Sequence, residues 1–323
     1  MEPSHLPAET AFRLRAVANT VRRHLHALPE RPSILAAGDH PLHFVREFTQ
    51  AFPRWRATAA GTSRGGAGNY VCGSPGALPF RSASFDVAVS LDALEHVPPA
   101  GRPRFTVELC RAAKSFAILT APFHHPATAA VERILDQAHR HAFGRPHPAL
   151  AQHVEHGLPD LREVLSQWPA GFGVQEVIPC YGLRAWLTWH ALALVREQRG
   201  ELDRNWTAWQ QAYTAEPAPP PGPVPYAWIL VARRGGATRP LSAMQLPDPE
   251  ADADLPELAR LYARLLEAGA GRGEGETTIA GKINQRLKRA LLAAEKELDA
   301  ERQRKAPPGI RELLRETLRR WLS

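Results

Sequence analysis

Three residues that can transfer protons or bind polar ligands follow one apolar run. Residues 85–91 read FDVAVSL, and Asp92, Glu95 and His96 come shortly after them. Carboxylates bind cations and polar groups, and imidazole has an unperturbed pKa near neutrality, which suits it to general acid–base catalysis. We therefore predict that this segment lines a cofactor or substrate cleft, with His96 as the candidate catalytic base. The alternative is that these side chains cap a helix and face solvent.

A second group of candidate residues lies between residues 124 and 156. It contains His124, His125, His139, His141, His147, His153 and His156, with Glu155 beside the last. Such a density of histidine suggests metal binding, but neither the HExxH motif nor a paired Cys/His spacing is present. The sequence thus predicts no metal site. We expect His124, His153, Glu155 and His156 to contact a hydroxylated acceptor, the alternative being helix capping and exposure to solvent.

The hydrophobic pattern predicts the scaffold that must position these residues. Short apolar runs predict strands at residues 33–38, 55–60, 69–72, 85–91, 115–120, 174–179 and 226–232. Apolar residues at helical spacing predict helices at residues 9–28, 44–52, 102–114, 161–168 and 183–199. Strands that alternate with helices in this way indicate an α/β domain with a doubly wound, mostly parallel sheet.

The same patterns divide the chain into four parts. An amphipathic helix within residues 1–30 precedes the α/β domain at residues 31–234. This domain is expected to carry helical insertions at about 124–170 and 183–215. Residues 235–281 are rich in Pro and Gly and predict a linker with one short helix, and residues 282–323 predict a basic, amphipathic helical tail.

Residues 78–98 carry a resemblance to a known family. They read LPFRSASFDVAVSLDALEHVP. This is similar to the middle of class I S-adenosylmethionine-dependent methyltransferases of the methyltransferase type 11 kind, in which an LPF loop, an FD strand and an LEH turn follow one another. The resemblance implies a Rossmann-like fold and S-adenosylmethionine as the cofactor. It assigns Leu91, Asp92 and Ala93 to the methionine part of that cofactor.

The resemblance also places the donor loop of the family at residues 34–42. It implies that Gly38, Asp39 and Pro41 form the remnant of this loop, and that Ser74 lies near the adenine. Glycines matter in such a loop because the backbone must approach the ligand closely.

This donor loop is altered in the present sequence. Ala36 replaces an acidic residue of the family's loop, while His40 and Leu42 take glycine positions. Residues 57–61 supply no carboxylate for the ribose hydroxyls, and Ser74 stands where the family has an acidic residue. Each lost charge-assisted hydrogen bond costs about 1.5–3 kcal/mol, so we expect cofactor binding to be weakened about a hundredfold or more.

The acceptor is suggested by a weaker resemblance. Residues 153–159 read HVEHGLP before a helical insertion, as in methyltransferases encoded among bacterial surface-polysaccharide enzymes. This similarity implies a small-molecule or saccharide acceptor and a role in polysaccharide biosynthesis. The insertion also contains aromatic residues, namely Trp186, Trp189, Trp206, Trp209 and Tyr213. They would form a lid that stacks on sugar rings or, alternatively, would pack in the core.

The excess of positive charge is concentrated at one end of the chain. The net charge is +7, and residues 277–323 hold twelve Lys or Arg against six Asp or Glu. A nearly neutral body argues against specific nucleic-acid binding. The tail at 282–323 is expected to pack on a helical protein partner or on an anionic membrane surface. Three cysteines without a CxxC pair, and no leader-like segment, predict a cytoplasmic protein, with peripheral attachment to the inner face of the membrane left open.

Two functions remain in view at this point. The first is S-adenosylmethionine-dependent methyl transfer to a hydroxyl of a small-molecule or saccharide acceptor. The second is a catalytically inactive, methyltransferase-like scaffold whose basic helical tail binds a partner or a membrane surface. The intact motif at residues 78–98 favours the first, and the altered donor loop favours the second.

Overall fold

The computed structural model describes residues 8–38, 41–62, 69–74, 76–199, 222–244, 246 and 258. The strands are β1 (Ser33–Gly38), β2 (Arg56–Gly61), β3 (Tyr70–Cys72), β4 (Phe85–Leu91), β5 (Ala113–Pro122), β6 (Phe172–Gly182) and β7 (Pro225–Arg234). The α-helices are α1 (Ala8–Arg23), α2 (Pro41–Ala51), α3 (Arg102–Ala112), α4 (Pro126–Phe143), α5 (Pro148–His156), α6 (Leu161–Ser166) and α7 (Leu183–Arg199). Short 3-10 helices include η1 (Leu25–Ala27), η2 (Leu94–His96) and η3 (Pro99–Gly101).

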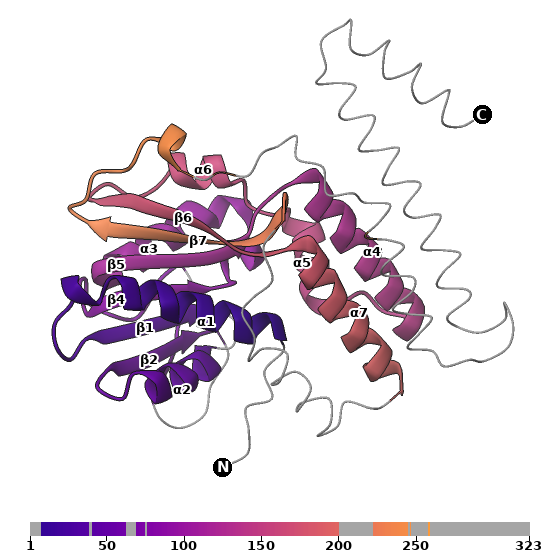
Figure 1. The fold of residues 1–323 in the computed structure, drawn as a ribbon, viewed down its shortest axis with the longest axis horizontal. Helices are drawn as coiled ribbons and strands as arrows, with labels where there is room; N and C mark the ends of the chain where they lie inside the picture. Colours follow the sequence, from indigo (N-terminus) through magenta and orange to yellow (C-terminus); the bar gives the residue numbers. More distant parts are fainter. Residues whose placement is uncertain are drawn as a thin grey trace, which may run out of the picture.

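All seven strands form one sheet in the order β3-β2-β1-β4-β5-β7-β6 (Figure 1). Strands β1 to β5 pair in parallel, whereas β7 runs antiparallel to both β5 and β6. The predicted class, a doubly wound and mostly parallel α/β sheet, is confirmed. The chain moves outward from β1 to β3 and then returns to place β4 on the other side of β1. The carboxyl ends of β1 and β4 therefore flank a topological switch point, where such sheets bind ligands.

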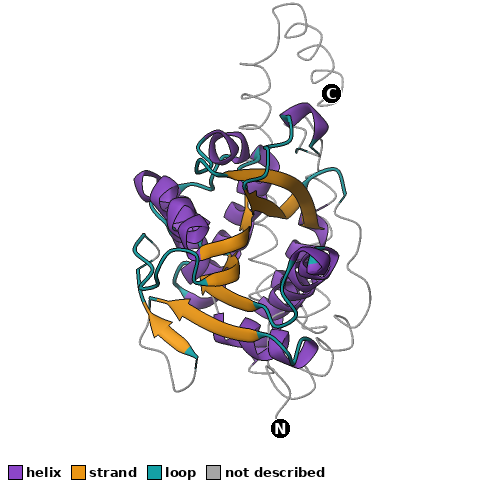
Figure 2. Ribbon diagram, turned by 90° about the vertical axis from the view of Figure 1, so that its left-hand side faces the viewer, coloured by secondary structure: helices purple, strands orange, loops and turns teal. Residues whose placement is uncertain are grey.

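Helices cover both faces of this sheet (Figure 2), because every central strand is apolar on both sides. Ile34 and Ala36 of β1 belong to one buried cluster, together with side chains of α1, α2, α4 and α7. Leu35 and Ala37 belong to a second cluster, on the face covered by α3 and α6. The continuous apolar runs seen in the sequence are thus strands buried on both faces.

The sequence left undecided whether the aromatic residues of the predicted insertions form a lid or pack in the core. Trp186 and Trp189 of α7 are buried, and their rings stack on Tyr226 and Phe12 respectively, so both pack in the core rather than forming a lid. Trp206, Trp209, Tyr213 and the predicted tail at 282–323 lie outside the described residues. Within the described part of the chain, no helix is both long and apolar enough to cross a membrane.

Candidate functional site

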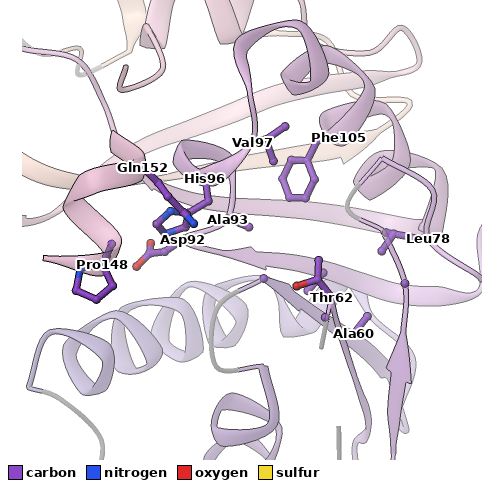
Figure 3. A pocket seen from close by; sticks show the side chains of 15 residues that line it. Ala60, Thr62, Leu78, Asp92, Ala93, His96, Val97, Phe105, Pro148 and Gln152 are labelled. Atoms are coloured by element: carbon purple, nitrogen blue, oxygen red, sulfur yellow. The ribbon is translucent and has the colours of Figure 1, made fainter. Parts of the chain in front are cut away.

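A cavity of about 460 Å³ opens at the carboxyl ends of β1 to β4. Its volume lies in the range typical of small-molecule sites. It is lined by Ala37, Gly38, Ala60, Gly61, Thr62, Gly73, Leu78, Asp92, Ala93, His96, Val97, Phe105, Pro148, Ala149 and Gln152. Figure 3 shows Asp92, His96 and Gln152 gathered at one end and Leu78 at the other. The cavity thus has a polar end beside η2 and α5 and a more apolar end beside the loop after β3.

Gly38 lines this cavity at a point where the backbones of β1 and β4 approach closely. Its φ is +124°, and a Cβ atom at this position would lie 2.3 Å from the carbonyl oxygen of Leu91. A positive φ and so close an approach require glycine. The glycine expected from the donor loop is therefore placed where a ligand could pass close to the main chain.

Asp92 places a carboxylate at the polar end of the cavity. It is a non-glycine residue with a φ of +40°, an uncommon conformation that often marks functional sites. Its Oδ1 accepts a hydrogen bond from Thr120 Oγ1 at 3.1 Å, and its Oδ2 pairs with the guanidinium of Arg13 from α1. Arg13 also donates to the hydroxyl of Tyr181 at 2.9 Å. Sequence reasoning missed Arg13, because nothing in its local pattern distinguishes it from the other arginines of α1.

The LPF loop is fixed to α3 by an ion pair. Glu108 accepts a 2.8 Å hydrogen bond from the backbone NH of Leu78 and two from Arg111, also at 2.8 Å. Arg111 donates to the carbonyl oxygens of Leu78 and Phe80 at 2.9 and 2.6 Å. The hydrogen bond with Arg111 lowers the pKa of Glu108 and raises that of Arg111. The motif residue Leu78 is thereby held against the apolar end of the cavity.

A buried polar network lies behind the polar end. Glu132 of α4 is 4% exposed, and its Oε1 lies 2.9 Å from Nδ1 of His153 and accepts a 2.8 Å hydrogen bond from the hydroxyl of Tyr226. The ring of His153 lies with its centroid 5.1 Å from that of His96. The network therefore connects α4, α5 and β7 to the wall of the cavity.

The predicted cofactor-binding and catalytic residues fall into three groups. Gly38, Asp92, Ala93 and His96 line the cavity. Leu91, Pro41 and Ser74 do not line it, although Leu91 contacts Gly38 through its carbonyl oxygen and Ser74 directly follows the lining residue Gly73. Asp39 lies outside the described residues. The end of β2 contributes Ala60, Gly61 and Thr62, so a hydroxyl is present where the family supplies a carboxylate.

The predicted acceptor residues are not brought together. His124 and Glu155 are exposed, His156 is partly buried at the end of α5, and none of the three lines the cavity. His153 is buried and faces the network behind His96. His125 and His147 act as helix caps, since their Nδ1 atoms accept from the backbone NH groups of Ala127 and Leu150 at 3.2 and 3.5 Å. Gln152, which sequence reasoning did not select, lines the polar end.

The fold and the motif at residues 78–98 are similar to those of class I methyltransferase domains. Residues 49–121 match the model of a family described as a methyltransferase domain. The matched range contains the motif at residues 78–98, so the resemblance stated from the sequence is confirmed. This range contains β2, β3 and β4, and ten of the fifteen residues that line the cavity.

Similar solved structures are also found. A candidate sarcosine dimethylglycine methyltransferase from Galdieria sulphuraria shares 15% identity, covers 70% of this chain and 87% of its own, and has a TM-score of 0.47. Magnesium protoporphyrin IX methyltransferase from Synechocystis, solved with S-adenosylhomocysteine, has 13% identity, coverage of 69% and 84%, and a TM-score of 0.40. No curated protein sequence matches the chain.

Proposed function

We propose that this protein binds S-adenosylmethionine in the cavity and transfers its methyl group to a hydroxyl of a small-molecule or saccharide acceptor. The observation that carries the proposal is the close approach of Gly38 to Leu91 at the switch point of the sheet, beside Asp92. The cofactor, when bound, supplies a methyl group on a positively charged sulfur. The protein must orient that group and exclude competing water, and alignment of this kind supplies much of the rate enhancement.

The residues of the cavity fit the two ends of the cofactor. The methionine part carries an ammonium and a carboxylate, and the polar end offers the carboxylate of Asp92 with the guanidinium of Arg13 behind it. A carboxylate has about four acceptor sites, so Asp92 can keep its bonds to Thr120 and Arg13 and still accept from an ammonium. The adenine fits the apolar end near Leu78, and the hydroxyl of Thr62 is available to the ribose.

The acceptor is proposed to enter between η2 and α5. His96, Pro148, Ala149 and Gln152 form this wall of the cavity. Among the described lining residues, His96 alone carries an imidazole, and Gln152 offers an amide that can bind a hydroxylated acceptor. A hydroxyl held here would face the methyl group of a cofactor whose methionine part lies on Asp92.

Calorimetric titration of the full chain with S-adenosylmethionine and S-adenosylhomocysteine tests the cofactor. We expect micromolar to millimolar binding that is lost in Gly38→Arg, because the new side chain fills the cavity. Transfer of a labelled methyl group to sugars, but not to the same sugars with every hydroxyl methylated, tests the acceptor. No heat with either ligand from a folded protein would instead support the inactive scaffold, which the missing carboxylate at the end of β2 favours.

A further inference from the structure

Glu95, His96 and His153 form a compact cluster at the polar end of the cavity. One potential ligand atom from each residue lies within 4.8 Å of the other two. Glu95 and His153 are 2% and 7% exposed, and His96 reaches the cavity wall. The cluster thus joins a buried carboxylate, a buried histidine and a partly exposed histidine, and buried ionisable groups are usually paired with one another or bind a metal.

The partners of His153 match those of a metal-bound histidine. Metal-binding histidines commonly use the second ring nitrogen in a hydrogen bond to a carboxylate, which fixes the ring and its tautomer. Nδ1 of His153 lies 2.9 Å from Oε1 of Glu132, and Tyr226 donates to the same oxygen at 2.8 Å. Nε2 of His153 is then the ring nitrogen that would bind the ion. The hydrogen bond from Tyr226 in turn holds the carboxylate of Glu132 in place.

Arg102 connects the two elements that supply the cluster. Glu95 and His96 come from η2, whereas His153 comes from α5. Arg102 bridges these elements: its Nε donates to the carbonyl oxygen of Val97 at 3.0 Å, and its Nη2 donates to those of His156 at 3.2 Å and of Gly157. Arg102 thus ties the segment after η2 to the end of α5.

We propose that Glu95, His96 and His153 bind one divalent transition-metal ion of the zinc type. Two imidazoles and one carboxylate form a known catalytic zinc ligand set, which leaves a fourth position open. In a tetrahedral site, ligand atoms lie about 3.4 Å apart, so ligand atoms within 4.8 Å of one another must approach by at most about 1.4 Å around the ion. The sequence showed no metal motif because the ligands come from two distant segments that only the fold brings together.

The open position would face the proposed acceptor, and this part of the inference rests on the proposed function. A bound cation lowers the pKa of a coordinated hydroxyl. The acceptor oxygen loses its proton to water, its lone pair forms the bond to the methyl carbon, and the carbon–sulfur bond breaks with its electrons neutralising the sulfonium. His96 is then a metal ligand rather than the general base expected from the sequence.

Metal binding is measured on the full chain without a histidine tag, stripped with a chelator and then dialysed against Zn²⁺ or Co²⁺. We expect one metal ion per chain by elemental analysis, and visible absorption bands of four-coordinate Co²⁺. His153→Ala and Glu95→Gln should each lower the affinity at least tenfold. His156→Ala, on the same helix but outside the cluster, should leave it unchanged.

Wild-type protein that retains no metal, or equal retention by His153→Ala and His156→Ala, would overturn the proposal and leave a hydrogen-bonded network. If His153→Ala fails to fold in a thermal melt, the partly exposed His96→Asn replaces it, and the Co²⁺ spectrum of the wild type decides independently. Binding of S-adenosylhomocysteine to the metal-free protein is measured separately. Failure of the metal site is thereby distinguished from failure of the cofactor assignment.

Discussion

Arg13 of α1 forms an ion pair with Asp92, the residue that directly follows β4. The pair fastens the leading helix to the polar end of the cavity, and both side chains are largely buried, with 11% and 7% of their surfaces exposed. Removal of one partner from such a pair leaves an uncompensated buried charge. The contact therefore couples the stability of α1 to the geometry of the candidate cofactor site.

Asp92→Asn should destabilise the protein by about 3–5 kcal/mol, because Arg13 loses its counterion while the amide keeps the shape of the side chain. Asn also tolerates the positive φ of this residue. Urea unfolding measures the loss. In the double variant with Arg13→Met, the combined loss should be smaller than the sum of the two single losses. Additive losses would show that the two side chains do not interact.

Gly38→Ala should lower both stability and cofactor affinity. The added Cβ would lie 2.3 Å from the carbonyl oxygen of Leu91, so β1 and β4 must separate at the cavity. Gly144→Ala is the matched control, since Gly144 has a φ of +69° but open space around its Cβ position. We expect the control to cost about 1–2 kcal/mol from the backbone alone and to leave calorimetric binding of S-adenosylhomocysteine unchanged. Equal affinities in the two variants would contradict the role given to Gly38.

Glu108→Gln should destabilise the protein by about 1–2 kcal/mol at pH 7, through the loss of charge-assisted bonds to Arg111 and Leu78. The pKa of Glu108 is lowered in the folded state, so its contribution is fully present above the unfolded pKa of about 4.5. The contribution is lost as the pH falls through the folded pKa. Unfolding at pH 7 and pH 3 should therefore show a difference from wild type that shrinks in acid.

Glu30→Gln provides the control for this experiment. Glu30 pairs with Arg54 at 3.4 Å, but both side chains are largely exposed, at 83% and 75%. Exposed pairs contribute little to stability because water screens them. A difference at pH 7 as large for Glu30→Gln as for Glu108→Gln would refute the assignment of the LPF loop to the Glu108–Arg111 clamp.

The native protein should react with a thiol reagent at Cys72 alone. Burial raises the pKa of Cys110 and of Cys180 to about 12, so neither forms appreciable thiolate at pH 8, whereas Cys72 is exposed. Iodoacetamide labelling followed by peptide mass spectrometry measures this. Cys72 precedes Gly73 of the cavity wall, so S-adenosylhomocysteine should slow its labelling. Labelling of Cys110 at the rate of Cys72 would mean that the core opens readily.

Much of the fold was predictable from the sequence because strands and helices of this domain carry local apolar patterns. The predicted ranges 33–38, 85–91 and 183–199 coincide with β1, β4 and α7. The motif at 78–98 likewise identified Asp92, Ala93 and His96, since residues that follow a parallel strand lie at its ligand-binding end. These conclusions need no knowledge of which distant segments meet.

The remaining features depend on which distant segments pack together, and only the tertiary structure decided them. The antiparallel direction of β7, the contact of Arg13 with Asp92, and the placement of His153 beside His96 join residues far apart in the chain. Local periodicity shows which side of a helix is apolar but not which neighbour will cover it. The sequence by itself therefore determined a methyltransferase-like α/β domain with a cleft after β4. The order of the sheet and the packing of α1, α4 and α5 decided which charged side chains surround that cleft.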